Sequence, residues 1–289
     1  MTDAAEVFAE HRPLLFSVAY EILGGVADAE DVLQESYLRW RDVDLGTVGN
    51  PRAYLARIVT RQALNALRSA ARRREEYVGP WLPEPLEAPS GDGPAEHVLT
   101  GEAVTTAMLL VLESLTPTER AVFVLREVFD FGYPEIAEAV GKSEATVRQT
   151  AHRAREHVRA RRPREVVAPS QAQTAAESFL IAASTGDIRT LMELLAPDVV
   201  YFGDGGGVVS AARRPVTGAE RVARLMVGFL RKSADMGELG LKFGVYNGMP
   251  SMVVSFDGVL DQVTSIEVQD GLISAVYTVR NPAKLAHVR

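Results

Sequence analysis

The sequence contains no cysteine and no long apolar run. Without cysteine, its 289 residues cannot form disulfides, thiolate zinc sites or a cysteine nucleophile, and a reducing cytoplasm is the expected location. Because no stretch approaches 18 consecutive apolar residues and the first residues carry no basic flank, we expect neither a membrane span nor export. The composition, 47% hydrophobic and 24% charged, is that of a globular chain of two or three domains.

One segment differs from the acidic average of the chain. Between Lys142 and Arg162 lie seven Lys or Arg residues and two Glu residues, although the formal net charge of the chain is −7. Upstream, residues 116–119 (TPTE) form a capping-box pattern with proline at the first helical position. A short helix over 134–140, a turn at Gly141 and a long helix capped by Ser143 follow. This order is typical of a helix-turn-helix that places its last helix in a major groove, and an ordinary helical hairpin is the alternative.

A second basic surface is predicted on the helix that begins at Asn50-Pro51. Seven arginines and no acidic residue lie between residues 51 and 74. At 100° per residue, five polar side chains fall within an arc of about 80°: Arg57, Arg61, Asn65, Arg68 and Arg72. A solvated helix face usually interleaves acidic residues with basic ones, so this face favours a polyanionic ligand.

The helix predicted over 28–41 carries acidic residues on one face, and together these three segments indicate a family. Asp28–Glu35, Asn50–Arg74 and Leu115–Arg155 resemble, in order, three segments of bacterial sigma factors of the extracytoplasmic-function (ECF) type. The resemblance covers residues 1–162. It implies an all-α sigma domain 2 over 1–74 and an all-α sigma domain 4, with the helix-turn-helix, over 97–162.

The resemblance also implies partners and contact residues. Domain 2 would bind the β′ subunit of the RNA polymerase core through Asp28, Asp31, Gln34 and Glu35. It would bind the minus-ten promoter element through Tyr54, Arg57, Arg61, Asn65, Arg68 and Arg72. Domain 4 would bind the minus-thirty-five element through Lys142, Glu144, Arg148, Gln149, His152, Arg153, Arg155 and Arg159. Residues nearest the start of that helix are best placed for base edges, and the later arginines for phosphates.

Residues 75–96 form an acidic linker rich in proline. Trp81 and Leu82 are unusual in a passive spacer, because they would be exposed to water without a partner. Either they dock on a domain or they enter the polymerase channel, and docking is favoured. A second short linker is expected over 163–170.

Residues 171–289 combine helical and strand patterns. Helices are expected over 172–183, 188–195 and 218–231, and a strand over 199–202 precedes a glycine-rich loop. Four further strand patterns (241–246, 251–256, 259–269 and 272–279) are separated by Asn-Gly, Asp-Gly and Asp-Gly turns. Helices packed on a curved antiparallel sheet resemble the SnoaL-like, nuclear-transport-factor-2-like (NTF2-like) α+β cone.

The cone and the linker together resemble the ECF subfamily that carries this extra C-terminal domain. The resemblance implies control in cis by a contact between the linker residues Trp81, Leu82, Pro83, Glu84 and Pro85 and the cone residues Asp204, Gly205, Gly206 and Gly207. Asn247–Pro250 and Asn281–Leu285 carry the same resemblance. Val208 and Ala283 depart from it, since Lys and Asp are common at these places.

Other functions fit the sequence less well. A ligand-responsive helix-turn-helix regulator that binds DNA without being a sigma factor is the first alternative. A cone enzyme is the second, with Tyr201, Asp204, Tyr246 and Asp257 as candidates by residue type, but Asp-Gly pairs are usually turns. We therefore expect no catalytic activity, no cofactor and no metal, and a small-molecule ligand of the cone is possible but unsupported.

Overall fold

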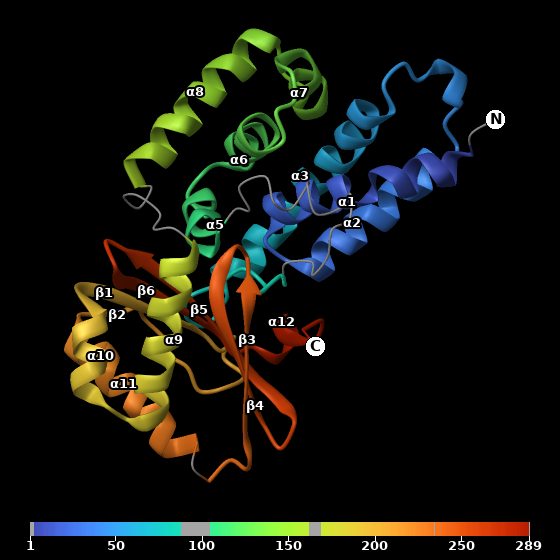
Figure 1. Cartoon of the computed structure of the whole chain (residues 1–289). Helices are drawn as coiled ribbons and strands as arrows, with labels where there is room; N and C mark the ends of the chain where they lie inside the picture. The colour runs from blue at the N-terminus through green and yellow to red at the C-terminus, as the bar shows by residue number, and fades with distance from the viewer. Residues whose placement is uncertain (1–2, 88–104, 162–168, 234, 289) are drawn as a thin grey trace. The chain divides into compact units, whose positions relative to one another are not determined.

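The computed structural model describes residues 3–87, 105–161, 169–233 and 235–288 (Figure 1). Contacts divide the chain into two compact units. The helical unit contains Met1–Glu76 and Met108–Arg162. The cone unit contains Tyr77–Ala88, Thr105–Ala107 and Pro163–Arg289.

The first half of the helical unit consists of α1 (Ala4–Leu23), α2 (Val26–Trp40) and α3 (Pro51–Glu75). Asp3 caps α1 in a capping box with Glu6, so the helix begins earlier than the apolar pattern indicates. Pro13 lies inside α1, and the helix continues through it. Burial of apolar side chains on all three helices, including fully buried Leu15 and Trp40, outweighs the missing proline N–H.

The second half contains α5 (Thr106–Glu113), α6 (Pro117–Phe123), α7 (Tyr133–Val140) and α8 (Glu144–Arg161). Thr116 caps α6 in the expected capping box, and a π-helical turn, Val124–Val128, extends it. Gly141 ends α7 in the left-handed region at φ 67°, and the Ser143 hydroxyl accepts a hydrogen bond from the Thr146 N–H at 3.3 Å. Helix, glycine turn and capped helix are thus present in the predicted order.

The cone unit is a six-stranded sheet with helices α9 (Pro169–Thr185), α10 (Ile188–Leu194) and α11 (Ala219–Ser233) (Figure 1). The strands are β1 (Leu195–Asp204), β2 (Val216–Thr217), β3 (Leu239–Tyr246), β4 (Met249–Phe256), β5 (Val259–Gln269) and β6 (Leu272–Val279), in the order β2-β1-β6-β5-β4-β3. The short helix α12 (Pro282–Leu285) follows β6. This is the expected SnoaL-like α+β architecture.

The sheet is not antiparallel throughout, which corrects one expectation. β3, β4, β5 and β6 pair antiparallel through the three predicted hairpins, whose Asn247, Asp257 and Asp270 have φ between 47° and 50°. β1, however, pairs with β6 in parallel, so the sheet is mixed. The strand pattern gave the number of hairpins but not this pairing, because β1 and β6 are far apart in the chain.

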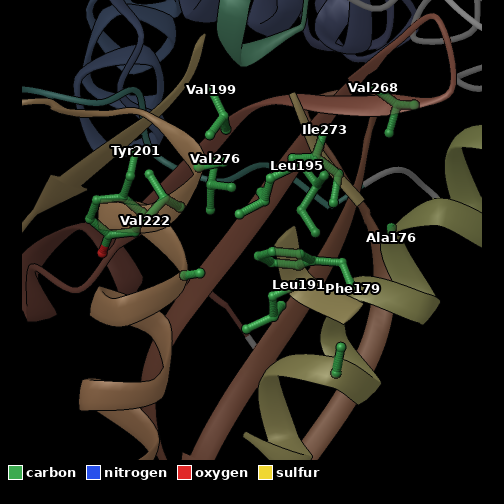
Figure 2. Packing of buried hydrophobic residues seen from close by; sticks show 14 of the residues in the cluster. Ala176, Phe179, Leu191, Leu195, Val199, Tyr201, Val222, Val268, Ile273 and Val276 are labelled. Carbon is green, nitrogen blue, oxygen red and sulfur yellow. The ribbon is translucent and has the colours of Figure 1, made fainter. Parts of the chain in front are cut away.

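The cone core lies between the sheet and the three helices. Phe179 of α9, Leu191 of α10 and Val222 of α11 are fully buried against Ile266 and Val276 of the sheet (Figure 2 shows all but Ile266 labelled). Packing of the helices against this face leaves the opposite face of the sheet for other segments of the cone unit.

Candidate nucleic-acid interface and linker contact

The predicted arginine face lies on α3. Arg57 is half-buried, and its guanidinium carbon lies 4.4 Å from the centroid of the Tyr54 ring. The Tyr54 ring in turn lies 5.7 Å from the ring of the buried Trp40, so it is held between the core and an arginine. Arg61 and Arg68 are exposed. The side chain of Arg72 lies outside the described part of the chain.

A groove separates α2 from α3 and joins two of the predicted site groups. Its volume is about 250 Å³, and it is lined by Asp28, Asp31, Val32, Glu35, Gln62, Asn65, Ala66 and Ser69. Asn65, predicted with the minus-ten group, therefore lies beside the predicted polymerase-binding carboxylates. Gln34 is exposed on α2 but is not part of the lining. The groove presents negative charge from α2 and amide groups from α3 to a ligand.

The basic helix α8 exposes most of its predicted reading face. Lys142, which precedes α8, and Gln149, His152, Arg153 and Arg159 are exposed. Arg148 is exposed too, but Glu144 bonds its guanidinium and raises the pKa of Arg148, and the Tyr133 ring lies 4.9 Å from it. Arg155 pairs with Glu127 at 2.7 Å. The polar side chains of Gln149 and His152 are thus exposed to solvent, whereas Arg155 is held by a carboxylate.

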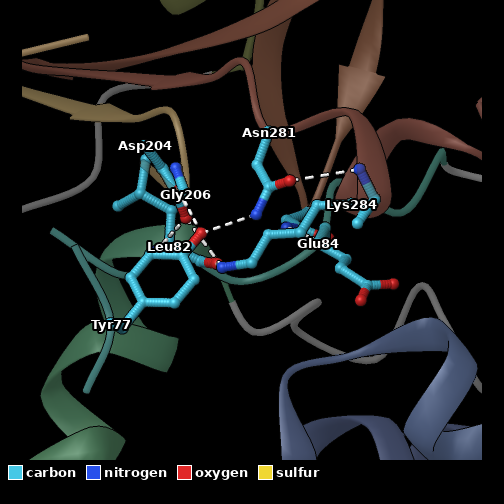
Figure 3. Close-up of polar contacts among 9 residues, drawn as sticks. Tyr77, Leu82, Glu84, Asp204, Gly206, Asn281 and Lys284 are labelled. Atoms are coloured by element: carbon cyan, nitrogen blue, oxygen red, sulfur yellow. Dashed lines mark hydrogen bonds and ion pairs between the residues drawn. The ribbon is translucent and has the colours of Figure 1, made fainter. Parts of the chain in front are cut away.

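The linker lies on the cone, where Asp204 at the end of β1 is its main acceptor (Figure 3). Asp204 is fully buried and accepts the Leu82 N–H at 2.8 Å and the Tyr77 hydroxyl. Burial and the bond to Asp204 raise the pKa of the Tyr77 hydroxyl. Leu82 is also fully buried, so it is part of the cone core and not an exposed residue of a spacer.

Lys284 of α12 neutralises Asp204 (Figure 3). Its ammonium group lies 2.7 Å from Asp204 Oδ2 and donates to the Leu82 carbonyl at 2.5 Å. It also lies 4.1 Å from the centroid of the Trp81 ring, a cation–π contact that gives this half-buried ring a partner. A buried ion pair with these additional bonds fixes the linker backbone to the cone.

The glycine-rich loop allows this close approach. A Cβ added at Gly206, whose φ is 60°, would lie 3.1 Å from the Tyr77 hydroxyl and would overlap the Asn281 amide. At Gly207, with φ 73°, it would lie 3.0 Å from Val78 Cβ. Gly205 is buried in the same loop. Residues with side chains would therefore force the linker away from β1.

The remaining predicted linker residues contact the last residues of the cone unit. The His287 imidazole bonds the Pro85 carbonyl at 2.8 Å and lies 3.8 Å from the Glu84 carboxylate. Pro83 is buried beside Leu82. The Glu84 carbonyl accepts from Asn247 Nδ2 at 3.2 Å, so the turn between β3 and β4 also holds the linker.

Comparisons with known proteins agree with these two units. The family model described as Sigma-70 region 2 matches residues 7–73, and Sigma-70, region 4 matches residues 105–158. The chain is 38% identical to the ECF RNA polymerase sigma factor SigJ of Mycobacterium tuberculosis, over 96% of this chain and 91% of that protein. This chain belongs to the ECF sigma factor family. It is also 32% identical to the probable ECF sigma factor SigI of the same species, over 96% and 93% of the two chains.

A solved structure shows that the likeness extends over the cone. The crystal structure of M. tuberculosis SigJ superposes with a TM-score of 0.76 at 34% identity and covers 98% of each chain. This ECF sigma factor therefore binds RNA polymerase core and promoter DNA and directs transcription initiation. The alternative of a regulator that is not a sigma factor is not favoured. Within the described residues, no helix is long and apolar enough to cross a membrane.

The candidates for a cone enzyme do not come together. Tyr201 and Asp204 point to opposite faces of β1, because they are an odd number of residues apart. Asp204 is already paired with Lys284, and Asp257 lies in a hairpin turn where it accepts the Glu238 N–H at 2.8 Å.

The predicted site did not include Tyr77 of the linker. It also did not include four residues beyond β1 that contact the linker: Asn247, Asn281, Lys284 and His287. Asn281 and Lys284 fall within the segment 281–285 that carried the family resemblance, and this was the available signal. Their partners could not be deduced, because Lys284 and Asp204 are separated by most of the cone sequence.

Proposed function

We propose that this ECF sigma factor divides promoter recognition between two domains and is controlled in cis by its cone. Residues 1–74 would bind the β′ subunit and the minus-ten element, and residues 97–162 the minus-thirty-five element. Residues 75–96 and 163–170 would be linkers, and 171–289 the regulatory domain. The protein would act without catalysis, in the cytoplasm where its polymerase works.

The exposed start of α8 supports its assignment to the upstream element. Gln149 and His152 present polar tips, and Arg148 is held in place by Glu144 and Tyr133. A guanidinium held in this way has lost part of its rotamer freedom before it reaches a guanine edge. Arg153 and Arg159, exposed further along the helix, suit phosphate contacts.

The two faces of the α2–α3 pair support the other two contacts. The carboxylates of Asp28, Asp31 and Glu35 line a surface that suits a basic segment of the polymerase β′ subunit, although Glu35 also pairs with Arg39 at 3.0 Å. The guanidinium groups of α3 suit the phosphates of a promoter strand, and the ring of Tyr54 lies beside them under Arg57.

Control in cis is supported above all by the buried Asp204–Lys284 pair. It lies under the linker that joins the two DNA-binding domains, and it bonds both the N–H and the carbonyl of Leu82. A linker anchored at Leu82 and at neighbouring residues limits the distance that the domains on either side can span. Loss of the anchor would lengthen the free linker and change the reach of domain 4.

The test is transcription by core polymerase with promoters selected from random-sequence DNA. Core with the full chain should initiate where core alone does not. Arg148→Ala should relax the selected upstream sequence, whereas Arg189→Ala on α10, where an exposed arginine also pairs with a glutamate four residues away, should leave it unchanged. Asp204→Asn should alter the tolerated spacing between the two promoter elements. If core with the full chain initiates from none of the selected promoters, the proposed division of roles is wrong.

A further inference from the structure

Within the helical unit, the arginine face of α3 is not free. The Arg52 guanidinium donates to the Phe129 carbonyl at 3.1 Å, and its central carbon lies 4.1 Å from the centroid of the Phe131 ring. Both partners belong to the segment that enters α7, the first helix of the helix-turn-helix. At the start of α3, Asn50 bonds Glu135 at 3.3 Å. One end of the predicted minus-ten surface thus contacts the domain predicted to read the other promoter element.

The contact continues one and two turns further along α3. Arg57 pairs with the Glu138 carboxylate at 3.2 Å. Arg61 donates to the Glu138 carbonyl at 2.7 Å and to the Ala139 carbonyl at 3.4 Å. Three successive arginines of α3 therefore have their guanidinium groups on oxygen atoms of α7 and of the segment before it.

These oxygens resemble a phosphate strand in chemistry. The Glu138 carboxylate carries a full negative charge, and the carbonyls of Glu138 and Ala139 lie in the last turn of α7, where the helix dipole is negative. Guanidinium groups bind carboxylates and phosphates with the same donor fork. A guanidinium that is bonded to α7 cannot bind a DNA phosphate at the same time.

The upstream reading surface is open in the same structure. Gln149, His152 and Arg153 of α8 are exposed, whereas Arg52 and Arg57 of α3 are half-buried. The closed arrangement thus engages Arg57 and Arg61 of one predicted DNA surface, whose Arg68 stays exposed, and leaves the other surface accessible. This difference would be unexpected if the contact only held two domains together.

We propose that α7 is an intramolecular substitute for the minus-ten phosphates, which masks the α3 arginines and must leave them before the promoter strand binds. The proposal rests on the proposed function of α3. Arg57 and Glu138 keep 27% and 68% of their side chains exposed, so this pair is weak enough to exchange for DNA. The segment that competes with promoter DNA for the α3 arginines is therefore part of the same chain. It is α7, the helix that precedes the recognition helix α8.

The first experiment observes α7 leaving α3. Because the chain has no cysteine, Ala27→Cys on α2 and Ala160→Cys on α8, both exposed, introduce the only two labelling sites. Energy transfer between two dyes is measured for the free chain and for its complex with core polymerase and a promoter fork with a single-stranded minus-ten segment. Transfer should fall in the promoter complex. Unchanged transfer in a complex that a mobility shift shows to be fully formed would overturn masking.

The second experiment measures the strength of the mask without polymerase. Glu138→Arg places a like charge beside Arg57 and Arg61, and its matched control is Glu193→Arg on α10, an equally exposed carboxylate in the cone. Affinity for a single-stranded minus-ten oligonucleotide is read by fluorescence anisotropy. The exposed Arg57–Glu138 pair helps to hold α7 on α3, so its loss should raise the affinity for the oligonucleotide about fivefold over the control. Glu138→Gln against Glu193→Gln should give a smaller change in the same direction.

The outcomes separate the mask from the function on which it rests. If three arginines are released, the slope of log affinity against log salt should steepen by about 2 for a single strand. Masking would be overturned if Glu138→Arg and Glu193→Arg bound the single-stranded oligonucleotide with equal affinity. It would also be overturned if neither variant bound the oligonucleotide. Failure of the full chain to form any promoter complex with core polymerase would instead refute the proposed role of domain 2.

Discussion

Glu21, near the end of α1, is a buried carboxyl group whose charge can be tested. Arg120 of α6, only 2% exposed, donates from Nε to the Glu21 carbonyl at 3.1 Å and pairs with the Glu113 carboxylate. Among the described residues, Glu21 Oε2 has no hydrogen-bond partner. Burial raises the pKa of Glu21 from 4.5 to about 8, although the Arg120 charge acts in the opposite direction. The group is therefore neutral at pH 7.

The sign of the pH dependence follows from this raised pKa. An unfolded chain releases the Glu21 proton near pH 4.5, while the folded chain retains it up to about pH 8. The contribution of Glu21 to stability is thus fully present below pH 4.5 and is lost as the pH rises through 8. Each unit between these values removes about 1.4 kcal/mol, so the loss at pH 7 is on the order of 3 kcal/mol.

The perturbation is Glu21→Gln, which keeps the shape of the neutral side chain and removes its titration. The free energy of unfolding of the variant should exceed that of the parent by on the order of 3 kcal/mol at pH 7 and by little at pH 5. Because the chain has two tryptophans, a Trp81→Phe background leaves Trp40 as the only indole, and Trp40 is buried in the helical unit. Urea unfolding is followed by its fluorescence from pH 5 to pH 8.

Glu10→Gln, an exposed change on α1, is the matched control and should show no such trend. The prediction that Glu21 is neutral would be refuted if the free energies of unfolding of Glu21→Gln and the parent differed by the same amount from pH 5 to pH 8. Destabilisation by Glu21→Gln at every pH would show instead that Glu21 is ionised and paired with Arg120.

Three further predictions concern the linker contact and the recognition helix. Asp204→Asn leaves the Lys284 ammonium buried without its carboxylate, so it should lower the free energy of urea unfolding of the cone unit by about 3–5 kcal/mol. The double variant with Lys284→Met should regain most of the lost stability. Gly206→Ala should cost at least about 1 kcal/mol in the same assay, because its φ is 60° and its Cβ meets Asn281. Arg148→Ala should lose about 1–3 kcal/mol of discrimination at one upstream base pair in competition binding with core polymerase.

Each of these has an outcome that contradicts it. A double variant no more stable than Asp204→Asn alone would show that Asp204 does not hold the linker through Lys284. Gly258→Ala, at φ 76° with open space around its Cβ, is the control for backbone strain without overlap. If it lowers the free energy of unfolding as much as Gly206→Ala does, the contact with the linker does not contribute to the cost at Gly206. A loss that is equal on all upstream sequences would make Arg148 a phosphate contact.

The elements that the sequence predicted well are those with local causes. Asn-Gly and Asp-Gly pairs at 247, 257 and 270 adopt positive φ, and each one forms the expected hairpin. Thr116 and Glu119 form their capping box because both partners lie within one turn of α6. Each of these signals needs only a few neighbouring residues, so a single sequence contains all of it.

Elements that depend on distant partners were missed or misjudged. The two-residue strand β2 exists only because Val200 and Tyr201 of β1 pair with it, and α12 has only four residues. α1 continues through Pro13 although proline lacks a backbone N–H, because its buried face stabilises the helix. In each case tertiary packing supplies the energy that the local pattern lacks.

The same distinction applies to the candidate site. The sequence indicated which residues carry charge, and the periodicity placed Arg57 and Arg61 on one face of a helix. It could not show that Glu138 lies across from them, because no local pattern connects α3 with α7. An acid-free arginine face suggests that its counter-charge comes from another molecule, but here a carboxylate 81 residues away supplies one pair. The absence of acidic residues from positions 51–74 is thus what leaves the arginines of α3 available to α7, and it is the same absence that would leave them available to DNA.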